Sequence, residues 1–251
     1  MKAEKYSVAA LTDCGKVRKS NQDAVLALHR RINETECVML AVADGMGGLQ
    51  HGERASRLVI SALSDWFDTR LEPMLKAGAA FEQIGAAITE FLHRTHVALA
   101  NEPERTGTTV SAMLVCGDRY LTLHAGDSRI YRSCEDMLFQ VTTDDTWVYH
   151  AFINGIITAQ EMPSHKYRHA LVNAVGIGQE LTVQRTEGII ESGERYLICS
   201  DGLYNELTNR QIGAVLNRNI ATEEKARSLM NAVLSGSAGD NISIVLLEQN
   251  V

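Results

Sequence analysis

Residues 37–48 read Cys-Val-Met-Leu-Ala-Val-Ala-Asp-Gly-Met-Gly-Gly, an apolar run that ends in a carboxylate and a glycine-rich turn. The run 37–42 is short, apolar and partly β-branched, which predicts a buried strand. Asp44 then stands at the tip of that strand, where glycines let the backbone bend tightly or approach a ligand closely. Such a strand end suits a metal or phosphate site, although an Asp-Gly pair alone is also typical of a hairpin turn.

Two further apolar runs carry an aspartate at one end. Asp201 follows the apolar residues 196–199 and precedes a glycine, and Asp240 comes just before the last apolar run, 242–245. Carboxylates at the ends of three separate strands can meet only in a folded core, and converging anions need cations between them. We therefore predict that Asp44, Asp201 and Asp240 surround bound cations.

The composition is that of a globular protein with a sizeable core. The chain has 251 residues, of which 45% are apolar, and its three prolines mark no linker rich in Pro, Gly or Ser. We therefore predict one domain over residues 1–251. The net charge of −7 and the lack of a basic block argue against a nucleic-acid-binding protein, whose affinity depends on Lys and Arg.

Cysteine spacing and the first residues indicate a compartment. The five cysteines show no CxxC pairing, and an odd, unspaced set favours a reducing environment. Residues 1–6 lack the apolar segment of a signal peptide, and no apolar run reaches the length of a membrane span. We expect a cytoplasmic protein with no membrane partner.

The hydrophobic pattern separates strands from helices. Period-two and apolar runs predict strands near 6–13, 23–29, 37–42, 107–115, 119–125, 130–132, 136–141, 181–189, 194–200 and 241–248. A period near 3.6 predicts helices from Gly52 to near Pro73, over 80–100, near 208–217, and over 222–235 with Thr222 as the N-cap. Strands and helices in separate blocks favour an α+β fold, a β-sandwich covered by helices.

Short motifs occur in a specific order along the chain. They are Arg18-x-x-Asn21-Gln22-Asp23, Asp44-Gly-Met-Gly-Gly48, Gly107-Thr-Thr109, Gly126-Asp-Ser-Arg129, Ser200-Asp-Gly202 and Gly239-Asp-Asn241. This series, which runs from Thr12 to Val245, resembles the metal-dependent protein serine/threonine phosphatases of the 2C type in their bacterial form. The resemblance implies a central antiparallel β-sandwich of two sheets, flanked by pairs of α-helices, with a two-metal centre at one end.

The resemblance also assigns metal ligands. Asp44 would bridge two divalent cations, Mn²⁺ or Mg²⁺, and the Gly45 carbonyl would ligate the second cation. Asp201 and Asp240 would hold the first. Carboxylate and carbonyl oxygens are the ligands that these hard ions prefer.

Further roles follow from the same resemblance. Asp23 would act through a bound water, and Asp127 with Asp201 would form the third, weaker metal site of bacterial members. Arg18 would bind the substrate phosphate, a task that suits the planar fork of a guanidinium. Residues 144–172, which break the strand pattern, would form the family's flap beside the site.

These assignments predict a signalling hydrolase. A water that bridges two divalent metals would attack the phosphate of phosphoserine or phosphothreonine on a protein, reversing a bacterial serine/threonine kinase. The expected partners are phosphorylated proteins, including that kinase and its targets. Two alternatives remain: a catalytically weak member that binds phosphoproteins, against which the intact aspartate set argues, and a hydrolase of small phosphate esters.

The sequence departs from the family at two places. Met46 stands where many eukaryotic members have His, so the general-acid role of that His does not transfer to this chain. Asp144-Asp145-Thr146 stands where bacterial relatives often read Asp-His-Ser, which bears on contacts of the flap. His51, close to the glycine-rich turn, could reach a substrate or face solvent at the start of a helix.

Overall fold

The strand β3 (Thr35–Asp44) shows how this sequence builds layers. In the computed structural model, which describes residues 4–46, 51–135 and 137–250, its side chains alternate between two apolar cores. The even-numbered residues from Val38 to Val42 pack between the two sheets, and the odd-numbered residues from Cys37 to Ala43 pack towards helices. A strand buried on both faces reads as a continuous apolar run, as the sequence of β3 does.

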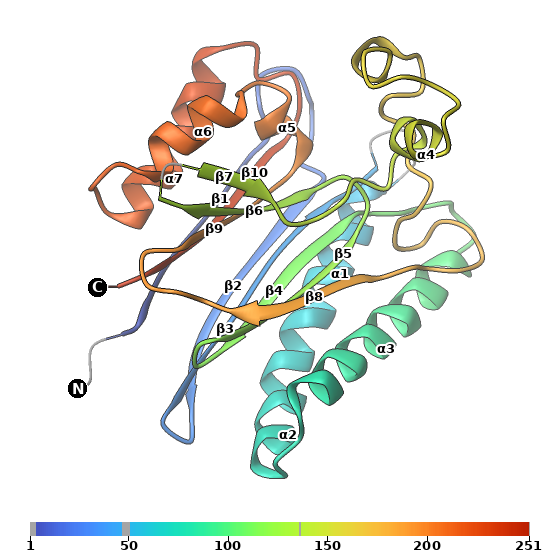
Figure 1. The fold of residues 1–251 in the computed structure, drawn as a ribbon. Helices are drawn as coiled ribbons and strands as arrows, with labels where there is room; N and C mark the ends of the chain where they lie inside the picture. Colours follow the sequence, from blue (N-terminus) through green and yellow to red (C-terminus); the bar gives the residue numbers. More distant parts are fainter. Residues whose placement is uncertain (1–3, 47–50, 136, 251) are drawn as a thin grey trace.

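The strands form two antiparallel sheets that pack face to face (Figure 1). One sheet has the order β1 (Tyr6–Asp13), β10 (Ile242–Gln249), β9 (Arg195–Cys199), β6 (Arg129–Cys134), β7 (Met137–Gln140). The other has the order β2 (Asp23–Ile32), β3, β4 (Val110–Cys116), β5 (Arg119–Ala125), β8 (Gln184–Ile189). The first and last strands, β1 and β10, pair with each other in the antiparallel sense, so the first and last elements of the described chain lie side by side in one sheet.

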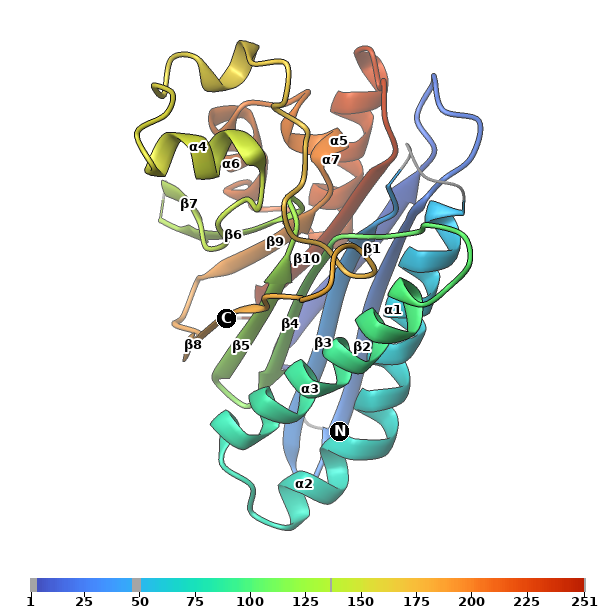
Figure 2. The ribbon, with the colours of Figure 1, turned by 90° about the vertical axis from the view of Figure 1, so that its right-hand side faces the viewer.

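Helices cover the outer face of each sheet (Figures 1 and 2). On the β3 sheet lie α1 (Gly52–Trp66), a π-helical turn (Phe67–Leu71), α2 (Glu72–Lys76) and α3 (Phe81–Ala100). On the β10 sheet lie α5 (Asp201–Tyr204), α6 (Asn209–Leu216) and α7 (Thr222–Ser235). None of the helices in the described residues is long and apolar enough to cross a membrane.

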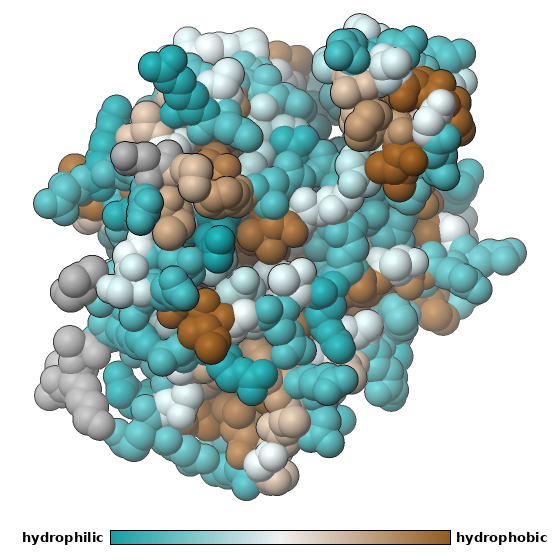
Figure 3. Space-filling model, in the orientation of Figure 1, coloured by the Kyte–Doolittle hydropathy of each residue, from teal (hydrophilic) through white to brown (hydrophobic). Residues whose placement is uncertain are grey.

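The segment 144–172 lies outside these layers, beyond one end of the sandwich. It contains α4 (Trp147–Ile153) and a 3₁₀ turn (Met162–Ser164). Figure 3 shows a mostly hydrophilic face on which apolar atoms gather over this segment, where Phe152, Ile153 and Ile156 are exposed.

The predicted fold, a central antiparallel β-sandwich of two sheets flanked by pairs of α-helices, is confirmed. Two local predictions are wrong. The helical stretch predicted to end near Pro73 continues to Lys76 as α1, the π-helical turn and α2, and Pro73 lies in the first turn of α2, where a missing N–H costs little. Thr222 is not an N-cap: Ala221 occupies that position, and the Thr222 hydroxyl instead donates to Glu248 at 3.1 Å.

Leu40 tests the core between the sheets, where its side chain is fully buried. Leu40→Ala is expected to lower the free energy of unfolding by about 3 kcal/mol, because it removes apolar contacts and leaves a cavity. Val97, on the exposed side of α3, provides the control, and Val97→Ala should change stability by less than about 0.5 kcal/mol. Urea denaturation measures both, and equal effects would contradict the layer assignment.

Candidate active site

The layer between the sheets becomes polar towards one end of the sandwich. Strand side chains alternate with a period of two, so every second residue of a strand faces the layer between the sheets. On several strands, the next residue in this inward-facing series is polar instead of apolar. These residues are Asp23 on β2, Asp44 on β3, Ser111 on β4, Ser200 after β9 and Ser243 on β10. The strand register places Asp23 directly opposite Asp44, so two carboxylates meet at this end.

Asp23 is buried beneath the site and is held by Ser200. The Ser200 hydroxyl donates to Asp23 Oδ2 at 2.7 Å, while the Ser243 N–H donates to Ser200 Oγ at 2.9 Å. Among the described residues, Asp23 Oδ1 has no hydrogen-bond partner. Burial raises the pKa of Asp23 to about 6, with the Ser200 bond acting in the opposite direction. A buried oxygen without a partner is costly unless a water or cation completes it.

The tip of β3 is fixed by the Gly107-Thr-Thr109 motif. The Asp44 N–H donates to Thr109 Oγ1 at 2.9 Å, and the Asp44 carbonyl accepts from the Thr108 hydroxyl and the Thr109 N–H, both at 2.9 Å. The next residue must be glycine, because a Cβ at Gly45 would overlap the carbonyl oxygen of Gly52. Gly47 and Gly48 lie outside the described residues.

The predicted site residues converge on one cavity of about 1030 Å³. Its lining includes Arg18, Asp44, Gly45, Asp127, Asp201 and Asp240. The remaining predicted residue, Asp23, lies beneath this lining as a buried neighbour of Asp44. Segments far apart in the sequence therefore bring their carboxylates to the same end of the sandwich.

Burial and mutual repulsion raise the pKa values of these carboxyl groups. Burial, followed by the charges of the neighbouring aspartates, holds the pKa of Asp44 well above its ordinary range. Burial and the charge of Asp127 are the main causes that raise the pKa of Asp201 to about 8. Burial and the charge of Asp144 raise the pKa of Asp127 to about 7. Without added positive charge, these groups cannot all ionise near neutral pH.

Arg18 supplies positive charge at the rim of the cavity. Its Nη2 lies 2.7 Å from Asp240 Oδ2, and this hydrogen bond raises the pKa of the guanidinium. Asp201 in turn accepts from Asn205 Nδ2 at 3.1 Å. Two candidate ligands thus each commit an oxygen to another side chain.

The donor set fits hard divalent cations. As the side chains stand, no three His, Cys, Asp or Glu residues within residues 4–46, 51–135 and 137–250 are arranged to hold a metal ion. The carboxyl groups nevertheless share one cavity, raise one another's pKa values and leave Asp23 Oδ1 without a partner. All of the candidate ligand atoms are oxygens, which Mg²⁺ and Mn²⁺ prefer.

Comparison with known proteins gives the family. The family model described as Protein phosphatase 2C matches residues 13–236. The chain belongs to the protein phosphatase 2C family. It is 36% identical over 244 residues to the serine/threonine protein phosphatase PstP of Mycobacterium tuberculosis, a match that covers 96% of this chain and 44% of PstP. The chain therefore spans less than half the length of that relative.

A further relative and two solved structures match this chain over nearly the whole length of the compared chains. Protein phosphatase PhpP of Streptococcus pneumoniae is 27% identical, and the match covers 97% of each protein. Among solved structures, the serine/threonine phosphatase of S. agalactiae superposes with a TM-score of 0.86 at 25% identity, over 98% of this chain and 100% of that one. The M. tuberculosis PstP/Ppp structure gives 0.82 at 34% identity, over 98% and 99%.

In this phosphatase 2C family member, other motif residues join the backbone segments that carry the candidate ligands. Asn241 donates to the carbonyls of Cys14 and Ser20 at 2.9 and 3.0 Å and accepts from the Gln22 N–H at 2.8 Å. These bonds hold the loop that carries Arg18 against the start of β10. Gly202 is needed because a Cβ there would overlap the Asn241 carbonyl oxygen.

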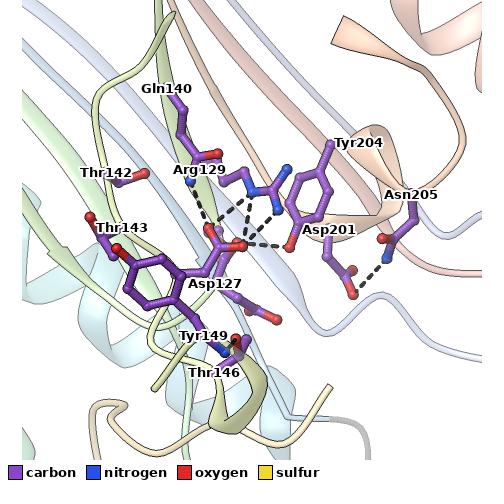
Figure 4. A network of polar contacts seen from close by, with 12 residues as sticks. Asp127, Arg129, Gln140, Thr142, Thr143, Thr146, Tyr149, Asp201, Tyr204 and Asn205 are labelled. Carbon is purple, nitrogen blue, oxygen red and sulfur yellow. Dashed lines mark hydrogen bonds and ion pairs between the residues drawn. The ribbon is translucent and has the colours of Figure 1, made fainter. Parts of the chain in front are cut away.

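The Arg129 side chain links the start of the 144–172 segment to α5 (Figure 4). Its Nη2 donates to Asp144 Oδ2 at 2.6 Å and its Nε to Asp144 Oδ1 at 3.0 Å, while the guanidinium lies 3.6 Å from the centre of the Tyr204 ring. The Tyr204 hydroxyl donates to the carbonyl of Asp127 at 2.8 Å. The Asp127 turn, α5 and this segment are therefore held as one unit.

Asp145, at the position where bacterial relatives often have His, connects the start of the same segment to residues at and after its end through hydrogen bonds. It accepts from Gly126 N at 3.0 Å, Asn173 Nδ2 at 2.7 Å and Gln184 Nε2 at 3.0 Å. Its carbonyl accepts from Val172 N at 2.9 Å. A carboxylate suits this place because it faces three donors, whereas a histidine would itself donate or be charged.

Sequence reasoning missed several cavity residues. Arg105, Arg168 and His169 line the cavity, but they lie in loops, outside any motif. Only the length of the 144–172 segment, where Arg168 and His169 occur, gave a signal. His51 is half exposed and lies 2.9 Å from Glu104, which supports its solvent-facing interpretation.

The raised pKa values predict how stability changes with pH. Asp127 and Asp201, with pKa values of about 7 and 8 in the folded protein, bind their protons more tightly than in the unfolded chain, where the pKa is about 3.9. This stabilisation is complete at low pH and is lost as the pH rises through the folded-state values. In EDTA, the free energy of unfolding should therefore fall from about pH 6.5 to pH 8.5.

Urea denaturation across that range measures the effect. Asp127→Asn, which removes one titrating group, should make the decline shallower. A free energy of unfolding that rises over the same range would contradict the assigned pKa values.

Proposed function

We propose that this chain hydrolyses phosphoserine and phosphothreonine on proteins with the help of divalent cations, reversing a bacterial serine/threonine kinase. The single observation that carries the proposal is the convergence of Asp44, Asp201 and Asp240 on one cavity with Arg18. The names of relatives that match this chain, which are serine/threonine protein phosphatases, support the same reaction.

Two cations would be held by the carboxylates. Asp44, the Gly45 carbonyl, Asp201 and Asp240 would bind two ions, Mn²⁺ or Mg²⁺, and Asp127 with Asp201 would bind a third, weaker one. When bound, such ions supply Lewis acidity and lower the pKa of a coordinated water. The catalytic domain of PstP has been solved with two manganese ions, at 33% identity and a TM-score of 0.78 to this chain, which supports this assignment.

The residues of the chain would position the substrate phosphate. The Arg18 guanidinium pairs with Asp240 through Nη2, and its other N–H groups remain to donate to phosphate oxygens. Asp23, anchored by Ser200, would hold a water beneath Asp44. Met46 lines the cavity, but its thioether has no acidic proton to donate. The leaving group would therefore take its proton from another group.

The remaining assignments are part of the same proposal. Residues 1–251 would form one phosphatase domain in which 144–172 acts as a flap beside the cavity, fixed at its base by Asp144 and Asp145. The partners would be phosphorylated proteins in the cytoplasm, including a serine/threonine kinase and its targets.

Asp240→Asn tests the reaction. With Mn²⁺ and a phosphothreonine peptide, the substitution should lower kcat/KM by more than about 100-fold, because it weakens both a metal ligand and the partner of Arg18. EDTA should abolish the activity of the wild type. Phosphate release is measured directly, and circular dichroism checks that the variant folds.

Asp68→Asn is the matched control, because Asp68 is exposed in the π-helical turn after α1. It should retain wild-type activity. Full activity of Asp240→Asn would refute the ligand assignment. A wild type that binds the phosphopeptide but hydrolyses nothing with any divalent ion would instead indicate a binding protein.

A further inference from the structure

The loop between α3 and β4 is held on α1 by two acidic residues that precede Arg105. Glu102 Oε1 accepts from Arg54 Nη2 at 2.9 Å, and Glu104 Oε2 lies 2.9 Å from His51 Nε2. The two negative charges just before Arg105 are thus directed to the start of α1. They do not neutralise Arg105 itself.

Among the described residues, no carboxylate pairs with Arg105, and the backbone next to it is anchored. The next residue, Thr106, is buried and donates to the carbonyl of His51 at 3.0 Å. Arg105 is exposed, lines the cavity and, in the part of the chain that the structure describes, forms no ion pair with a carboxylate. Arg18, in the same lining, is already paired with Asp240.

The cavity is large enough for more than one phosphorylated side chain. Its volume of about 1030 Å³ matches the upper end of pockets that hold whole drug-sized molecules, about 300–1,000 Å³. The protein carries a net charge of −7, so an anionic substrate is repelled in general and depends on local cations for attraction. A guanidinium binds carboxylate and phosphate oxygens alike.

We propose that Arg105 forms a second anion-binding position in the cavity, which favours substrates with an acidic or phosphorylated residue close to the residue being dephosphorylated. This inference rests on the proposed phosphatase function and adds a determinant of its substrate choice. Arg105 binds the neighbouring anion of the substrate and takes no part in hydrolysis.

The test compares three phosphothreonine peptides that differ only in their flanking residues: neutral, glutamate, or a second phosphothreonine. Initial rates with Mn²⁺ are followed by mass spectrometry, with p-nitrophenyl phosphate as a substrate that has no flanking residues. The wild type should favour at least one anionic peptide by about 10-fold in kcat/KM, the effect of one charge-assisted contact. The responding peptide identifies the anion.

Arg105→Glu should remove this preference by raising KM, with kcat and the hydrolysis of p-nitrophenyl phosphate unchanged, and Arg105→Lys should keep part of it. Arg70→Glu is the matched control: it makes the same charge change at an exposed residue of the π-helical turn and should behave as the wild type. Thermal melting confirms that the variants fold.

Equal kcat/KM values for all three peptides in the wild type, or an unchanged preference in Arg105→Glu, would overturn the inference. An equal loss on p-nitrophenyl phosphate would also overturn it, because Arg105 would then act on the reaction or the fold. Titration calorimetry with non-hydrolysable phosphonate peptides should show the same preference. That measurement tests Arg105 even where hydrolysis, and hence the proposed function, fails.

Discussion

Repulsion between carboxylates buried at one end of the sandwich is the constraint around which this structure is arranged. Asp23 and Asp44 face each other on neighbouring antiparallel strands, a placement that is destabilising for like charges. The neighbouring aspartates, Asp127 and Asp201 among them, raise the pKa of Asp44 further. The three apolar layers provide the stability that lets the fold hold such a site, which is complete only when positive charge is added.

The motifs contain two kinds of residue with different tasks. Asp44, Asp127, Asp201 and Asp240 place carboxylates in the cavity lining, and Thr109, Asn241 and Gly202 fix the backbone on which those carboxylates stand. Arg129 and Asp145 extend the same framework to the base of the 144–172 segment. Because loop backbone is fixed by hydrogen bonds to strands, the site has the rigidity of the sandwich although most of its residues lie at strand ends.

The sequence predicts the position of a site residue where that position follows from the local hydrophobic pattern. The run before Asp44 predicts a buried strand, and alternation along that strand determines which face the carboxylate occupies. Residues that long-range packing brings to the cavity could not be predicted individually: Arg105 lies outside any motif, and for His169 only the length of the 144–172 segment gave a signal. The short helix α5, which begins at Asp201, was missed because four residues give no helical period. The ion pair between Arg18 and Asp240 joins segments whose contact only the tertiary fold creates.

The most direct test is anomalous diffraction at the manganese edge from crystals of this protein grown with Mn²⁺. Two peaks about 3.5–4 Å apart are expected between the carboxylates of Asp44, Asp201 and Asp240, with Asp240 turned from Arg18 towards one of them. A map with no peak among these three side chains, at a manganese concentration that supports hydrolysis, would contradict the assignment of this cavity as a metal centre.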